Sequence, residues 1–220
     1  MLVIGRRNLL LGGAALAAVS VAACGGGGGG AGSISPDDMV LGDTDAPVTL
    51  IEYGSVMCGH CAQFHAAVWE QLKANYIDTG KVRFVFREIL SPAQPEIIPV
   101  IALAGFQVAR CGNASPEQYF NRVGVLMHQQ PAIFAAGSIE GVRAKFIEIG
   151  DAAGLSQEQV LACIADPTGG ERADRISRAA GSSVTGTPTF FINGEKVEDP
   201  SVMTYEGISR LLDAAIAAAA

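Results

Sequence analysis

Residues 48–61 of this 220-residue chain read VTLIEYGSVMCGHC, and this stretch decides the fold. Its first part, Val48–Tyr53, is short and rich in β-branched and aromatic residues, which predicts a strand. Its last four residues are Cys58-Gly59-His60-Cys61, and a helical pattern continues from Ala62 to Asn75. A second run of the same kind follows at Val82–Glu88. Strand, helix and strand in this order predict a βαβ unit with a parallel pair of strands.

The middle of the chain, residues 96–181, has helical signals and no strand-like alternation. Ser115 with Gln118, and Ser156 with Gln159, have the spacing of helix-capping boxes. We therefore predict that this whole segment is helical.

Residues 182–220 return to a sheet pattern and then end in a helix. Phe190–Ile192 and Glu195–Val197 flank Asn193-Gly194, which is a strong hairpin signal. Apolar residues at helical spacing from Ile208 to Ile216 predict a last helix that packs on the sheet. The expected architecture is an α/β fold whose two halves, 41–95 and 182–220, are separated by a helical insertion.

The Cys-x-x-Cys motif between a strand and a helix, together with the segment Thr185–Gly194 and its proline, resembles the thioredoxin superfamily. The helical segment between the two halves is similar to the DsbA-like branch of that superfamily, and the resemblance covers about Val40–Ala220. It implies a thioredoxin fold with an inserted all-helical domain and a thiol–disulfide oxidoreductase activity.

Two cysteines at i and i+3 in the first turn of a helix have Cβ atoms roughly 5–6 Å apart, so the pair can open and close with little backbone motion. The helix N-terminus stabilises an anion, and His60 adds a group that can be cationic or donate a hydrogen bond. We expect these effects to lower the pKa of Cys58. Cys58 is then the exposed attacking sulfur and Cys61 is the shielded resolving one.

The resemblance implies roles for three further residues. Pro188 would be in the cis form and face the cysteines, while Thr187 would pair with a client strand through its backbone and select clients through its side chain. Glu52, six positions before Cys58, would be a buried acid beneath Cys61 that accepts a proton during exchange. The alternative for Glu52 is an edge residue turned to solvent. Arg87 or Glu88 are candidates for its charged neighbour, whereas His65 and His128 are expected on helix surfaces or in the core.

The five cysteines are an odd number for an oxidising compartment. If Cys24 is lipid-modified, four remain, and Cys111 and Cys163 can form a structural disulfide beside the redox pair. Two buried free thiols are the alternative.

The N-terminus has the pattern of an export signal. Residues 1–23 contain Arg6-Arg7 and an apolar run, Leu9–Ala23, that is shorter than the roughly 20 residues of a membrane span. The run ends on a lipobox-like sequence before Cys24, and residues 24–40 form a glycine-rich tether. We expect a lipid-anchored protein on the periplasmic side of a bacterial membrane. Ordinary signal cleavage, which would leave a soluble periplasmic protein, is the alternative, and the Sec and twin-arginine routes both remain open.

The acidic net charge of −7 argues against a nucleic-acid partner. We predict a monomeric oxidase without a cofactor or metal that introduces disulfides into unfolded exported client proteins. A quinone-linked membrane thiol oxidase would then reoxidise it. Gly59 stands where DsbA-type oxidases commonly have proline, so a disulfide reductase or isomerase on the same scaffold is a second hypothesis. A third is a non-catalytic lipoprotein that binds partner proteins or metal, with Cys58, Cys61 and His65 as three ligands.

Overall fold

A five-stranded mixed sheet forms the centre of the computed structural model, which describes residues 33–90 and 95–220. The strand order is β1-β3-β2-β4-β5. The predicted parallel pair is confirmed because β2 and β3 run parallel, with Glu52 opposite Phe86. The strands β1, β4 and β5 are antiparallel to their neighbours. The five strands are β1 (Met39–Leu41), β2 (Val48–Gly54), β3 (Val82–Glu88), β4 (Thr189–Ile192) and β5 (Glu195–Lys196).

Strand β1 was not expected, because residues 39 and 40 fall in the predicted tether of residues 24–40. Met39 pairs with Phe86 and Val40 with Val85, so β1 covers what would otherwise be the open edge of β3. The folded domain therefore begins earlier than predicted. The predicted signal peptide, Cys24 and the predicted tether up to residue 32 lie outside the described residues.

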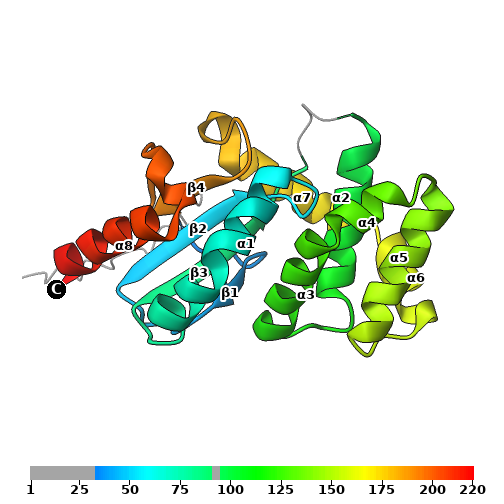
Figure 1. Ribbon diagram of the computed structural model, residues 1–220, viewed down its shortest axis with the longest axis horizontal. Helices are drawn as coiled ribbons and strands as arrows, with labels where there is room; N and C mark the ends of the chain where they lie inside the picture. The colour runs from blue at the N-terminus through cyan, green and yellow to red at the C-terminus, as the bar shows by residue number, and fades with distance from the viewer. Residues whose placement is uncertain (1–32, 91–94) are drawn as a thin grey trace, which may run out of the picture.

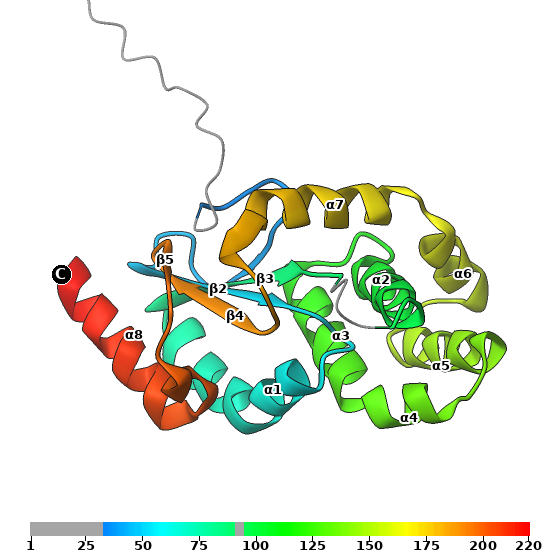
Figure 2. The same cartoon turned by 90° about the horizontal axis from the view of Figure 1, so that it is seen from above.

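Helices cover both faces of the sheet (Figure 2). On one face lie α1 (Gly59–Leu72), which continues into a π-helical turn at Lys73–Ile77, and α8 (Tyr205–Ala219). On the other face lies α7 (Thr168–Ala180). The alternation along β2 supplies both layers, because Leu50 joins the larger core with α1 and α8 while Ile51 and Tyr53 pack with Ile176 of α7.

The insertion is a bundle of helices beside the sheet (Figure 1), and the capping boxes at Ser115 and Ser156 are both formed. Its elements are α2 (Ile97–Arg110), α3 (Pro116–His128), α4 (Gln130–Ala135), α5 (Ile139–Ala152) and α6 (Gln157–Ala165). Helix α7 falls within the predicted insertion of residues 96–181 but covers the sheet, because its buried residues Ile176 and Ala180 complete the apolar layer over Tyr53.

The C-terminal part follows the prediction. Asn193 and Gly194 have φ values of 49° and 89°, as a two-residue type I′ hairpin turn requires. Two short 3-10 turns, Gly181–Ser183 and Pro200–Met203, lead into β4 and α8. Ile208 and Leu212 of α8 are fully buried, which confirms the predicted apolar stripe.

Candidate active site

The cysteine motif lies where β2 ends and α1 begins. Cys58 is the N-cap residue of α1, and Gly59, His60 and Cys61 form its first turn. Both cysteines are free thiols. Cys61 is completely buried, as expected, but Cys58 is only 6% exposed rather than freely exposed as predicted. The Thr187 carbonyl oxygen lies 3.3 Å from the Cys58 sulfur and is one of the groups that cover it.

Several hydrogen bonds lower the pKa of Cys58 to about 5. The largest effect is the hydrogen bond from the Cys61 side chain, and partial burial opposes it. The side chain of Thr187 and the backbone N–H groups of Cys61 and His60 add smaller stabilising bonds. His60 thus acts here through its backbone, while its side chain is exposed. The site stabilises Cys58 as a thiolate at neutral pH, as the sequence predicted.

Cys61 has the opposite environment. Burial raises the pKa of its thiol strongly, and the hydrogen bond to Cys58 and the negative charge of Glu52 raise this pKa further. Cys61 therefore stays protonated whenever it is reduced. One sulfur of the pair is a stable anion and the other is a stable thiol.

The predicted cis peptide bond is confirmed at Thr187–Pro188, just before β4. In its protonated form, Cys58 donates a hydrogen bond to the Thr187 carbonyl oxygen, which lies 3.3 Å from the sulfur. The segment that the sequence placed opposite the cysteines therefore contacts the reactive sulfur directly.

Glu52 is fully buried, so the expectation of a buried acid is confirmed and the solvent-facing alternative is wrong. Its Oε2 atom lies 2.9 Å from Nε2 of His65. Its Oε1 atom is buried and has no hydrogen-bond partner among the described residues. His65 is thus a core histidine, one of the two positions expected for it.

The predicted charged neighbours of Glu52 are wrong. The register places Phe86, not Arg87, opposite Glu52, and side chains alternate between the two faces. Arg87 therefore lies with Tyr53 on the other face and donates a hydrogen bond to its hydroxyl at 2.6 Å. Glu88 instead accepts hydrogen bonds at the junction with the helical bundle, from Arg110 at 2.6 Å, Arg172 at 3.1 Å and Tyr119 at 3.0 Å.

Gln130 is a site residue that sequence reasoning missed. It begins α4 in the inserted bundle, and its side-chain amide donates to the carbonyl oxygens of Val56 at 2.7 Å and Cys58 at 3.1 Å. A glutamine that is distant in the sequence offers no local signal for this contact. The insertion therefore fixes the backbone that carries the reactive sulfur.

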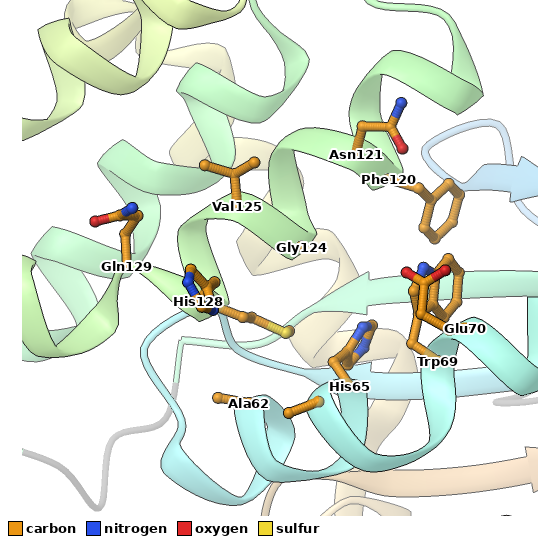
Figure 3. Close-up of a pocket in the computed structure, with 12 residues that line it drawn as sticks. Ala62, His65, Trp69, Glu70, Phe120, Asn121, Gly124, Val125, His128 and Gln129 are labelled. Atoms are coloured by element: carbon orange, nitrogen blue, oxygen red, sulfur yellow. The ribbon is translucent and has the colours of Figure 1, made fainter.

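A groove of about 440 Å³ lies between α1 and α3 (Figure 3). His65 and Trp69 project into it from α1, and His128 lies on the α3 side. The His65 ring stacks on Trp69 with ring centroids 5.1 Å apart, so its orientation is fixed by packing as well as by Glu52.

Cys111 and Cys163 form a disulfide with Cα atoms 5.7 Å apart, which confirms the predicted pairing. It joins the end of α2 to α6 within the bundle. Within residues 33–90 and 95–220 there is no group of three or more His, Cys, Asp or Glu side chains that could hold a metal ion. In the same part of the chain, none of the helices has the length and apolar character needed to cross a membrane.

A thioredoxin-type sheet with a cysteine pair at the start of α1 and a cis-proline opposite defines the class of this protein, and comparison with known proteins agrees. A family model described as Thioredoxin matches residues 34–214. A Rickettsia bellii protein provisionally named a protein-disulfide oxidoreductase is 31% identical over 188 residues, which cover 83% of this chain and 66% of that protein. The chain thus spans just under two thirds of the length of this relative.

Two solved structures share the fold. Wolbachia pipientis alpha-DsbA1 has a TM-score of 0.69 and 24% identity, with 84% of this chain and 94% of that chain covered. Bacillus subtilis BdbD has a TM-score of 0.68 and 17% identity, with 82% and 94% covered. The chain belongs to the thioredoxin family, and its fold is similar to that of the solved DsbA structure.

Proposed function

We propose that this protein is an exported thiol:disulfide oxidoreductase that introduces disulfides into unfolded exported proteins through a mixed disulfide at Cys58. The observation that carries the proposal is the asymmetry of the pair: the pKa of Cys58 is about 5, whereas burial raises that of Cys61. The relative named as a protein-disulfide oxidoreductase supports the same reaction class.

The reaction follows from this asymmetry. A client thiolate attacks Cys58 of the oxidised pair, the Cys58–Cys61 bond breaks, and Cys61 leaves and takes up a proton. A second client thiolate then attacks the client sulfur of the mixed disulfide. This step releases Cys58 as a thiolate, which is a good leaving group because its pKa is low. The client loses two electrons and gains a disulfide, and the cysteine pair is reduced.

The low pKa also favours the oxidase direction over the reductase. Lowering the pKa of Cys58 from 9.0 to about 5 stabilises the reduced form at pH 7 by about 2.7 kcal/mol, or about 60 mV of reduction potential. Because the reduced form of the pair is stabilised in this way, the oxidised form transfers its disulfide to clients more readily.

The test uses two variants and one potential. Cys58→Ser is expected to abolish oxidation of a reduced client peptide, and Cys61→Ser is expected to accumulate mixed disulfides on gels run without reductant. Equilibration of the wild-type pair with glutathione then separates the two directions. A potential near about −270 mV, as in thioredoxin, would favour the reductase or isomerase. Unchanged dithiol oxidation by Cys58→Ser would refute the assignment of the nucleophile.

The location and partners belong to the same proposal. Residues 1–23 would direct export, and a lipid on Cys24 would anchor the domain on the periplasmic side, beside a quinone-linked membrane thiol oxidase that restores the disulfide. Incorporation of radiolabelled palmitate into the full-length chain, and its loss in Cys24→Ser, tests the anchor. Label that persists in Cys24→Ser would contradict it.

A further inference from the structure

The buried sulfur of Cys61 raises a question of proton supply. When the redox disulfide is opened, Cys61 leaves as a thiolate in a place with no exposed surface. Burial and the nearby charge of Glu52 both disfavour that anion. A proton therefore has to reach Cys61, and Glu52 is the acid whose charge acts on it.

Glu52 cannot exchange its proton with water directly, because it too is fully buried. One of its oxygens has no hydrogen-bond partner among the described residues, and the other lies 2.9 Å from Nε2 of His65. His65 is thus the group in contact with Glu52 that can both give and take a proton.

His65 also reaches the groove between α1 and α3 (Figure 3). Its side chain keeps 6% of its surface exposed, whereas that of Glu52 keeps none. The rings of Phe64, Trp69 and Phe86 surround the imidazole and hold it in place.

The ionisable groups that face His65 come from three elements. Glu52 lies on β2, Cys61 and Glu70 lie on α1 itself, and His128 on α3 lies across the groove. Strand β3 contributes only the aromatic ring of Phe86. Of these groups, Glu52 is the one within hydrogen-bond distance of the His65 ring.

We propose that His65 is the proton relay of this site and that the groove is its opening to water. As the disulfide opens, one proton passes from water in the groove to His65, from Nε2 of His65 to Oε2 of Glu52, and from Glu52 to the Cys61 thiolate, so that His65 and Glu52 each end in the state in which they began. On reoxidation the same steps run in reverse, so protons and charges balance over the cycle. The inference deepens the proposed function and rests on it.

The main test compares His65→Gln with His128→Gln. Glutamine at position 65 keeps a hydrogen-bonding amide but cannot carry a proton, and position 128 lines the same groove without contact to Glu52. The probe is reduced glutathione, and the measurement is the rate at which it opens the Cys58–Cys61 disulfide between pH 5 and pH 9. We expect His65→Gln to lower this rate about 10- to 100-fold and to remove one ionisation from its pH profile, while His128→Gln keeps the wild-type profile.

A double variant isolates the pathway through Glu52. In a Glu52→Gln background the relay is already interrupted, so adding His65→Gln should change the rate less than twofold. A wild-type rate and pH profile in His65→Gln, or fully additive losses in the double variant, would overturn the relay.

Two spectroscopic measurements do not depend on turnover. Trp69 is the only tryptophan in the chain and stacks on His65, so protonation of the imidazole is expected to quench its fluorescence. The quenching should appear in wild type and His128→Gln and be lost in His65→Gln. If His65→Gln fails to fold, an NMR titration of the His65 ring in the wild type replaces the fluorescence test. The titration curve of this ring should then differ between the oxidised and the reduced protein.

These outcomes separate the two proposals. Failure of the wild-type disulfide to react with thiols would refute the proposed function. Normal reaction of the wild type, with a His65 titration that is independent of the redox state of the pair, would refute the relay alone.

Discussion

Replacing Thr187 by valine removes the hydroxyl of Thr187 while keeping the shape of its side chain. That side chain gives one of the hydrogen bonds that lower the pKa of Cys58 to about 5. A hydrogen bond to a charged group contributes about 1.5–3 kcal/mol, which corresponds to about 1–2 pKa units. We therefore expect Thr187→Val to raise the pKa of Cys58 to roughly 6–7. The backbone carbonyl that accepts from the Cys58 thiol remains.

The assay is the ultraviolet absorbance of the thiolate as the reduced protein is titrated, with Cys58→Ser as the blank. Thr187→Ser keeps a hydroxyl and should titrate near the wild-type value. The reduction potential of Thr187→Val should fall by about 30–50 mV, since about 1.4 kcal/mol of lost stabilisation of the thiolate lowers it by 30 mV. A Thr187→Val protein that still titrates near 5 would refute the reasoning, because the hydroxyl would then contribute nothing to the anion.

Three other predictions concern stability. The pKa of Cys58 is lower in the folded than in the unfolded protein, so the stability that its thiolate contributes is fully present above the unfolded value near 9 and is lost as pH falls through about 5. In urea unfolding, the free energy of unfolding of the reduced wild type should fall by about 2 kcal/mol between pH 7 and pH 5 relative to Cys58→Ser. Parallel pH dependence of the two proteins would contradict this. Replacing both Cys111 and Cys163 by serine opens a loop with a sequence separation of 52 and should lower the free energy of unfolding by about 4 kcal/mol, without changing the alkylation rate of Cys58. A decrease below about 1 kcal/mol would show that this disulfide does not constrain the unfolded chain. Glu88→Gln leaves Arg110 and Arg172 without their shared carboxylate and should lower the unfolding free energy by about 3–5 kcal/mol, whereas a neutral effect would mean that water solvates these guanidinium groups.

The elements that could be predicted are those with a strong local pattern. Strand β2, the capping boxes, the Asn193-Gly194 turn and the apolar stripe of α8 each depend on neighbours within a few residues. Strand β1 has three residues, too few to show a periodicity. Helix α7 could be predicted as a helix, but the layer that it covers is decided by tertiary packing.

The candidate site divides in the same way. Cys58, Cys61 and Pro188 carry recognisable motifs, whereas the partner of Glu52 depends on the register of β2 against β3. A slip of one residue would place either Arg87 or Val85, instead of Phe86, opposite Glu52. His65 did carry a signal, because four positions after Cys61 a helical residue lies on the same buried face. Nothing in the sequence near Gln130 indicates its contact with the Cys58 backbone.

That amide has a consequence for protein engineering. The side-chain amide of Gln130 donates from α4 to the carbonyl oxygens of Val56 and Cys58, so the helical bundle supports the backbone that carries Cys58. The bundle therefore cannot be removed without affecting the active site. Excising it to make a minimal thioredoxin would leave two carbonyl groups without their donor next to the nucleophile. A chimera that takes its bundle from another protein would need a side-chain donor at the same place.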